Sequence, residues 1–198
     1  RQVYRDRKII CVFQPHRYSR VKLLKNEFAS SFKSGDVVVL CPVYSAGEKI
    51  KYNFVLRSGV NQTDVVGSEQ FPFYIFSAYA DKRINFFSAF QLGVEAFFSK
   101  ALEEEIHYRS VAFPEMSSDP GADYKRIGGF LGYELFINNW SMVTQLGYYL
   151  YYPYDFEGRI YNRLGLKYYF NQKWFGTVSV KSHIATAESV EFGIGIRL

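Results

Sequence analysis

The chain lacks any apolar run long enough for a transmembrane helix, which needs about 20 consecutive apolar residues. If this protein meets the interior of a membrane, we therefore expect it to do so with strands. It also lacks a block of basic residues, because the net charge of +5 is spread along all 198 residues. Binding to nucleic acid is thus not expected, whereas a basic surface beside anionic lipid head groups is compatible with this charge.

Cysteine is scarce as well. Cys11 and Cys41 both lie in apolar runs, so we expect buried free thiols rather than a disulfide or a metal site, which would need more ligands. No metal and no cofactor are expected.

The chain begins at Arg1, and nothing near it has the basic, apolar and small-residue pattern of a secretion signal. We expect either that the sequence is trimmed or that it is not exported.

Aromatic residues, by contrast, are abundant at 19% of the chain, and in the last third they take part in a regular alternation. Four consecutive segments between residues 140 and 198 alternate apolar with polar residues, and short turn signals separate them. In the last segment one face carries Val190, Phe192, Ile194, Ile196 and Leu198, and the other carries Ser189, Glu191, Gly193, Gly195 and Arg197. A period of two residues predicts strands, each with one apolar and one polar face.

Alternation of this kind occurs in soluble sandwiches and in membrane barrels. The apolar face here is rich in Trp, Tyr, Phe and Leu, and the polar face mixes Arg, Lys and Glu with Gly. This combination favours a small barrel with lipid outside and a packed polar interior, in which glycines make room for long charged side chains. Aromatic residues near the strand ends are expected to form interfacial girdles, namely Trp140, Tyr151, Tyr152, Tyr168, Tyr169 and Trp174.

The sequence therefore predicts a mainly β fold, an antiparallel membrane barrel of about eight strands over residues 71–198. Three further strands are expected at 73–80, 84–98 and 124–137, and residues 52–57 provide an eighth if they are counted. Residues 52–70 are otherwise a linker. Short turns at 81–83, 138–139 and 171–172 alternate with longer connections at 99–123, 153–158 and 184–188, as periplasmic turns and extracellular loops do. The alternating last strand resembles an outer-membrane assembly signal, although Leu198 stands where Phe is usual.

Residues 1–51 have a different pattern. Continuous apolar runs at 8–13 and 36–43 flank a segment with helical spacing at 21–32, which predicts a parallel strand–helix–strand unit. Such strands need helices on both faces, and one crossover unit cannot bury them.

The stretches VFQPHRYSR, DVVVL and VYSAGE resemble the start of the C-terminal domain of UDP-N-acetylmuramate L-alanine ligase, an ATP-dependent cytoplasmic enzyme of peptidoglycan synthesis. The resemblance implies that His16, Arg17 and Arg20 bind substrate, and a cationic loop before a helix suits a carboxylate or phosphate. The glycine-rich ATP loop and the Mg²⁺ ligands of that family are absent from the sequence. We therefore expect a ligase-like fragment without catalytic competence, in which these three residues are alternatively solvated loop residues.

A second resemblance covers residues 71–198. The run from Thr144, with the K-x-H strand end at Lys181 to His183 and the closing EFGIG, resembles lipid A 3-O-deacylases and acyloxyacyl-hydrolase-like outer-membrane barrels. That family implies a Ser nucleophile, a His base and an acidic orienter acting on lipid A or another outer-membrane lipid. His183 matches the base, but Ala185 stands where the serine is expected. Thr186 and Ser182 are then the neighbouring hydroxyls.

Two carboxylates are candidates for the acid. Glu188 has the family's spacing to the C-terminus, and Glu191 shares the face of His183 if the hairpin pairs Lys181 with Glu191. Glu191 is alternatively a salt-bridge partner within the barrel, to Lys181 or Arg197. His183 is alternatively a hydrated residue at a strand end.

The sequence thus predicts an outer-membrane barrel resembling lipid A 3-O-deacylase, either active or inactive for want of the serine. The alternative is a ligase fragment joined to a non-catalytic barrel. The two parts belong to different compartments, the cytoplasm and the outer membrane. We therefore hypothesise a join near residues 52–70, made by gene fusion or by an assembly artefact. Neither the oligomeric state nor the lipid substrate follows from the sequence.

Overall fold

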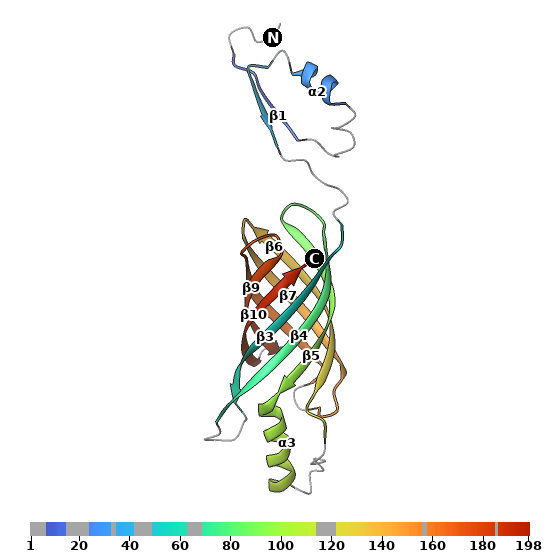
Figure 1. Cartoon of the computed structure of the whole chain (residues 1–198), viewed down its shortest axis with the longest axis vertical. Coiled ribbons are helices and arrows are strands. Elements are labelled where there is room, and N and C mark those ends of the chain that lie inside the picture. The colour runs from blue at the N-terminus through green and yellow to red at the C-terminus, as the bar shows by residue number, and fades with distance from the viewer. Residues whose placement is uncertain are drawn as a thin grey trace. The chain divides into compact units, whose positions relative to one another are not determined.

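The computed structural model describes residues 7–14, 24–32, 35–41, 49–62, 69–113, 122–155, 158–184 and 186–198. The chain forms two compact units, one containing the N-terminal segment and one containing a barrel (Figure 1). Two helices are described, α2 (Lys25–Ser31) and α3 (Lys100–Ala112). Neither has the length and apolar character of a membrane-spanning helix.

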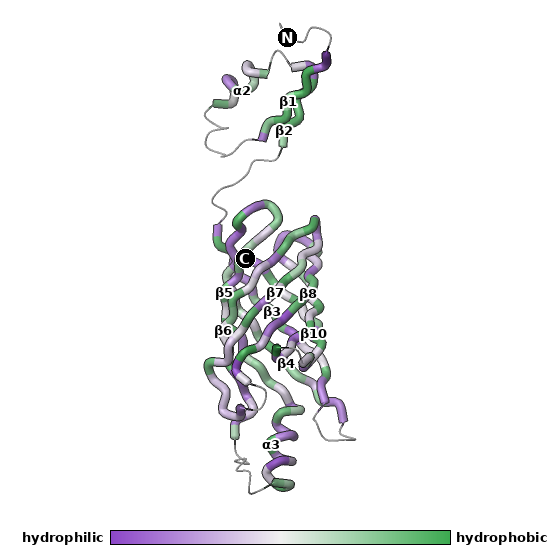
Figure 2. Tube along the Cα trace, turned by 180° about the vertical axis from the view of Figure 1, so that it is seen from behind, coloured by the Kyte–Doolittle hydropathy of each residue, from purple (hydrophilic) through white to green (hydrophobic). Residues whose placement is uncertain are grey.

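The N-terminal unit contains β1 (Ile10–Phe13), α2 and β2 (Val37–Leu40). The two strands are parallel, with Ile10 opposite Val37, which confirms the predicted strand–helix–strand order. The ring of Phe13 lies 5.0 Å from that of Phe28 and 5.1 Å from that of Phe32, so α2 covers one face of the pair. Both strands are hydrophobic along nearly their whole length (Figure 2). Cys11 and Cys41 are free thiols, as expected, but they are half-buried rather than buried.

The second unit is a closed antiparallel barrel, which confirms the predicted fold class. Its strands are β3 (Lys51–Gln62), β4 (Gln70–Arg83), β5 (Ser88–Ser99), β6 (Arg126–Ile137), β7 (Trp140–Tyr151), β8 (Ile160–Tyr169), β9 (Trp174–His183) and β10 (Thr186–Arg197). Each pairs with the next along the chain, and β10 pairs with β3 to close the ring. The backbone N–H of Leu198 donates to the carbonyl of Tyr52 at 2.8 Å at this closure.

Several predicted boundaries differ from the structure. The barrel begins at Lys51, so the first part of the expected linker is β3, the optional eighth strand. Residues 81–83, expected as a turn, belong to β4, and the chain reverses at 84–87 instead. The reason is that Asp81 faces inward, where Arg197 donates to it at 2.6 Å and Asn53 at 2.7 Å. The expected loop after β5 contains the helix α3, which the sequence pattern did not predict.

The connections fall at two ends of the barrel. One end, here called the turn end, carries the reversals at 84–87, 138–139 and 170–173 together with Leu198. The other, the loop end, carries the connections at 63–69, 100–125, 152–159 and 184–185. Helix α3 extends from the loop end in Figure 1. The predicted alternation of short and longer connections is largely present, although β9 and β10 are joined by only two residues.

The barrel is apolar outside and polar inside, as the alternation predicts. Outward side chains such as Leu92, Leu164 and Ile194 are 64%, 58% and 52% exposed, whereas the side chains of Arg163 and Lys167 inside the barrel are each 1% exposed. Two expected girdle residues are exceptions. Tyr152 is buried inside the barrel, because Leu150 is an extra residue where β7 pairs with β6 and the alternation is reversed beyond it. Tyr169 lies on the inward face of β8 and donates to Glu134 at 2.7 Å.

The polar interior is held together by buried ion pairs. At its centre Arg163 donates to Glu191 and to Glu95, both at 2.7 Å, and Arg57 donates to Glu95 at 3.1 Å. Nearer the turn end, Lys167 donates to Glu134 at 2.9 Å. Charges taken out of water are tolerated only when they are paired and hydrogen-bonded. These contacts therefore fix which residues face each other across the barrel.

Glycines make room for the large interior side chains. The ring of Tyr161, which is fully buried, lies directly over Gly147 on the neighbouring strand β7. A Cβ atom at Gly147 would overlap this ring. The ring cannot withdraw, because the rings of Tyr149 and Phe97 pack against it at 4.8 Å and 5.4 Å.

Gly147→Ala is therefore expected to lower the free energy of unfolding by about 1–3 kcal/mol, the usual cost of overpacking. Gly129→Ala is the matched control, since its nearest neighbour would be the Leu150 side chain at 3.7 Å, an ordinary contact. Denaturant unfolding of the full chain in detergent micelles measures both. If the two variants unfolded with their midpoints at the same denaturant concentration, this account of the packing would be contradicted.

Candidate active site at the loop end of the barrel

The hairpin of β9 and β10 brings the predicted site residues to the loop end. Along β9 the side chains of Lys181 and His183 face the interior and are buried, while Ser182 between them faces outward. The amide of Asn162 donates to the Ser182 hydroxyl at 2.9 Å on this outer side. Because alternate residues of a strand lie on opposite faces, Ser182 and His183 cannot act on the same group.

A β-bulge in β10 determines which carboxylate reaches His183. The register pairs His183 with Thr186 and Ser182 with Ala187, but Lys181 is opposite Ser189. Glu188 is therefore an extra residue on its strand, and a bulge of this kind redirects a side chain. Thr186, directly opposite His183, shares its face of the sheet.

Glu188 is in contact with three basic side chains. Its Oε2 lies 2.5 Å from Nζ of Lys181 and 3.4 Å from Nδ1 of His183, and its Oε1 lies 3.7 Å from Nη1 of Arg126. The side chains of Lys181 and His183 are 2% and 8% exposed. A carboxylate beside Nδ1 favours the tautomer that carries its proton there, in which Nε2 is unprotonated and can accept a proton.

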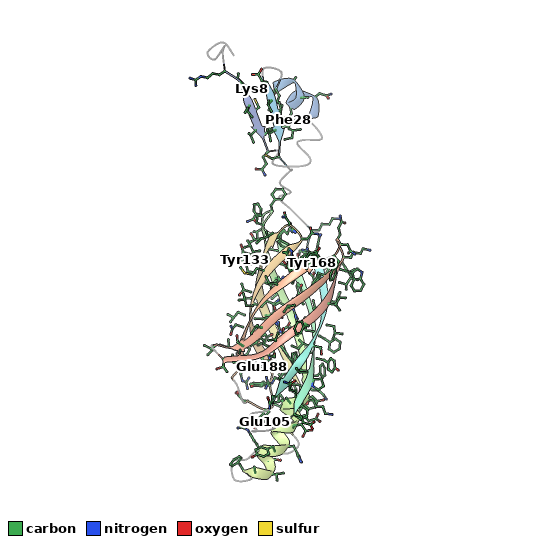
Figure 3. All side chains as sticks on the ribbon, turned by 90° about the vertical axis from the view of Figure 1, so that its left-hand side faces the viewer. Lys8, Phe28, Glu105, Tyr133, Tyr168 and Glu188 are labelled. Carbon is green, nitrogen blue, oxygen red and sulfur yellow. The ribbon has the colours of Figure 1, made fainter. Side chains whose placement is uncertain are left out.

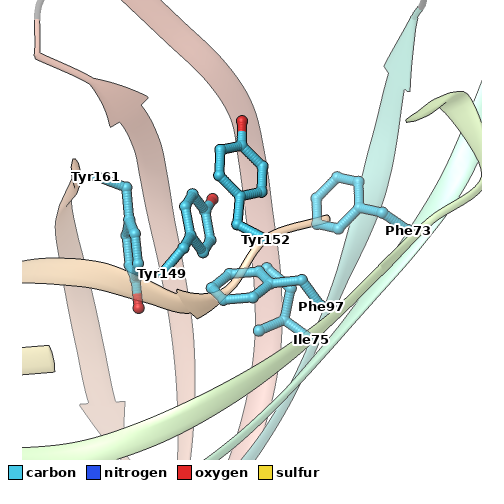
Figure 4. Packing of buried hydrophobic residues seen from close by; sticks show 6 residues of the cluster. All are labelled: Phe73, Ile75, Phe97, Tyr149, Tyr152 and Tyr161. Atoms are coloured by element: carbon cyan, nitrogen blue, oxygen red, sulfur yellow. The ribbon is translucent and has the colours of Figure 1, made fainter. Parts of the chain in front are cut away.

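Aromatic residues fill the barrel directly beneath this cluster. Figure 4 shows the rings of Tyr149, Tyr152, Tyr161, Phe73 and Phe97 gathered together with Ile75. The ring of Tyr149 lies 5.9 Å from that of His183. Since these rings are buried and packed, a substrate would approach from the loop end rather than through the barrel. Figure 3 shows Glu188 and Glu105 of α3 at this same end, with Tyr133 and Tyr168 at the other.

Glu191, the other candidate for the acid, lies apart from the cluster around His183. The register sets it opposite Ser179, whose hydroxyl donates to it at 2.7 Å, and not opposite Lys181 as one reading of the sequence assumed. Its side chain is fully buried and is held by Arg163 rather than by Lys181 or Arg197. Glu191 therefore belongs to the central ion pairs and does not contact His183 in the structure.

Of the predicted residues, the structure brings His183 and Glu188 into contact, and it separates Ser182 and Glu191 from them. Thr186 is paired with His183 in the register and is exposed. His16, Arg17 and Arg20 of the ligase-like segment lie outside the described residues, as does Ala185.

The sequence reasoning missed Lys181 and Arg126 as partners of Glu188. Lys181 shares the face of His183 two residues away, and this spacing was a usable signal.

Comparison with known families identifies the barrel. The family model for the acyloxyacyl hydrolase C-terminal domain matches residues 50–198, which include every strand of the barrel. The chain belongs to this family. Membership of the acyloxyacyl hydrolase family and the closed eight-stranded barrel together fit an outer-membrane protein.

A separate likeness concerns a short part of the chain. It is 61% identical over 54 residues to the UDP-N-acetylmuramate–L-alanine ligase of Pelagibacter ubique (strain HTCC1062), a match that covers 27% of this chain and 12% of the ligase. The ligase of Brachyspira hyodysenteriae is 52% identical over 48 residues, or 24% of this chain and 10% of that enzyme. The chain thus spans about a tenth of the length of these ligases, which supports the predicted resemblance to a fragment.

The geometry predicts that Glu191 stabilises the barrel. Glu191→Gln leaves the buried Arg163 and Arg57 with one carboxylate fewer, so the free energy of unfolding is expected to fall by about 3 kcal/mol. Glu104→Gln, the same change on the exposed side of α3, is the control and is expected to have no effect. The measurement is denaturant unfolding of the full chain in micelles. A stability loss no larger than that of the control would count against a structural role for Glu191.

Proposed function

We propose that this protein is an acyl-ester hydrolase of the outer membrane that acts on an acylated lipid of the outer leaflet, of the lipid A class. The observation that carries the proposal is the contact of 3.4 Å between His183 and Glu188 at the loop end of a barrel with an apolar outer surface. A base and an acidic orienter are two of the three parts of a hydrolytic triad.

The position of the pair supports the choice of substrate. In outer-membrane barrels the short turns face the periplasm and the longer loops face the outside. With this orientation, His183 and Glu188 lie at the outer leaflet, where the acyl esters of its lipids are within reach. Outward aromatic residues near the strand ends, such as Trp140 and Trp174, suit the membrane interface.

In the proposed reaction Thr186 supplies the nucleophile. Nε2 of His183 takes the proton of the threonine hydroxyl as its oxygen attacks the acyl carbonyl carbon. The ester bond breaks, the leaving alkoxide takes the proton from His183, and the acyl group remains on Thr186. A water molecule, deprotonated by His183, then releases the fatty acid and restores the hydroxyl. Glu188 keeps the imidazole in the required tautomer throughout.

A barrel without hydrolase activity is the second candidate. Two observations favour it, Ala185 at the expected serine position and the ammonium of Lys181, which lies closer to Oε2 of Glu188 than His183 does. The ligase-like segment adds no activity to either candidate, since it corresponds to about a tenth of a ligase.

The test is to express the full chain behind a secretion signal and to analyse the lipid A of the host by mass spectrometry. The parent is expected to remove one hydroxyacyl chain. His183→Asn and Thr186→Val are expected to abolish this loss because they remove the base and the nucleophile, whereas Thr186→Ser retains it.

Ser182→Ala is the matched control, since its hydroxyl faces outward, and it is expected to behave as the parent does. Heat-modifiable migration on gels verifies that each barrel has folded. Unchanged lipid A with a folded parent barrel would overturn the hydrolase proposal in favour of the second candidate. Activity that survives in Thr186→Val but not in His183→Asn would overturn the role of Thr186 alone.

A further inference from the structure

We infer that Lys181 is a positioning residue, whose ammonium holds the Glu188 carboxylate where it can accept a hydrogen bond from Nδ1 of His183. This inference rests on the proposed function and adds a fourth residue to it. Lys181 itself does not touch the substrate, because the aromatic rings and Glu188 surround its ammonium.

The ammonium of Lys181 is fixed on several sides. Its Nζ lies 4.6 Å from the ring centre of Phe97, 5.4 Å from that of Tyr149 and 5.6 Å from that of Tyr161. Cations over aromatic faces are attracted more strongly when they are desolvated. A lysine side chain is ordinarily free to move, but this one would lose all three ring contacts and its contact with Glu188 by moving.

Glu188, in contrast, has little else to fix it. It is the extra residue of the bulge, where the ladder of backbone hydrogen bonds is interrupted. Its side chain is 13% exposed, more than those of its partners, and a glutamate loses considerable rotamer freedom on being ordered. The contact of 2.5 Å with Lys181 is shorter than its contacts with His183 and Arg126. Lys181 therefore determines where the carboxylate lies.

The charged and titratable groups around the carboxylate come from four strands. Lys181 and His183 are on β9, Glu188 is on β10, Arg126 is on β6 and Tyr149 is on β7. The guanidinium of Arg126 is also stacked over Tyr149, at 5.3 Å. When Lys181 is removed, Arg126 is the cation that remains beside Glu188, and the carboxylate is expected to turn toward it and away from His183.

Lys167 provides a matched control. It is also a buried lysine, its Nζ lies 2.9 Å from Glu134, and it is 5.0 Å from the rings of both Tyr79 and Phe175. Its contacts lie nearer the turn end and do not include a histidine. Lys167→Met therefore removes the same kind of buried ion pair without altering the surroundings of His183.

The experiment compares Lys181→Met, Lys181→Arg and Lys167→Met in the full chain. The first readout is kcat/KM for lipid A dispersed in detergent. A displacement of about 1 Å in a catalytic geometry costs on the order of 100-fold in rate, and a loss of this size is expected for Lys181→Met. Lys181→Arg keeps the charge and should recover part of the rate. Lys167→Met should remain within about 3-fold of the parent, although both methionine variants lose stability.

The second readout needs no substrate. The ¹⁵N chemical shifts of the His183 ring, measured in the folded barrel in micelles, report which nitrogen carries the proton. Lys181→Met is expected to change these shifts toward a mixture of tautomers, and Lys167→Met is expected to leave them as in the parent. If Lys181→Met does not fold, Lys181→Gln, which keeps a hydrogen-bond donor at this position, is used for both readouts.

The two readouts separate the two proposals. An active parent whose Lys181 variants keep both kcat/KM and ring shifts would overturn the positioning role and leave the hydrolase standing. An inactive parent whose ring shifts still respond to Lys181→Met would overturn the hydrolase and leave the positioning role standing. Equal losses of kcat/KM in Lys181→Met and Lys167→Met, with unchanged ring shifts, would reduce Lys181 to a structural residue.

Discussion

The pairing of buried charges inside the barrel is the constraint on which the rest of this structure depends. Arg163, with a side chain 1% exposed, donates to Glu95 and Glu191 on strands far from it in the sequence. Water cannot screen these charges, so each one must find its partner. A shift of one residue in any strand would turn its charges to the outer surface and its apolar residues inward. The ion pairs therefore fix the register of the whole barrel.

The candidate site follows from this fixed register. Ser179 and Glu191 must face each other in the central network, yet His183 and Thr186 are paired at the end of the same hairpin. One extra residue has to be accommodated between these points, and it forms the bulge at Glu188. The carboxylate beside His183 is thus provided by a local irregularity that the regular part of the barrel imposes.

The two units of the chain differ in which side chains they bury. The barrel buries its polar side chains and presents an apolar outer surface, which suits surroundings of lipid. The N-terminal unit has apolar strands with one helix across one face, an arrangement that a larger α/β sheet would complete. The match to the acyloxyacyl hydrolase family begins at residue 50, next to the first residue of β3. The family boundary and the structural boundary therefore coincide.

The sequence by itself determined the class of the fold. Alternation along β7 to β10 predicts one apolar and one polar face, and the choice of Trp, Phe and Leu for one face with Arg, Lys and Glu for the other indicated lipid outside. His183 was also accessible from the sequence, through the resemblance of its K-x-H strand end to the acyloxyacyl-hydrolase-like family. What only the tertiary structure decided was the partner of each inward residue.

Asp81 was read as part of a turn because its partner, Arg197, is 116 residues away. Glu191 and Glu188 could not be separated because alternation carries no information about a bulge. The helix α3 was missed because its stretch of residues is mostly polar. Tyr169 was assigned to the outer surface for its residue type, whereas Tyr152 was assigned there by its even position in the alternation, which the extra residue Leu150 reverses. For Asp81 and Glu191 the deciding contact joins residues on strands that come together only when the barrel forms.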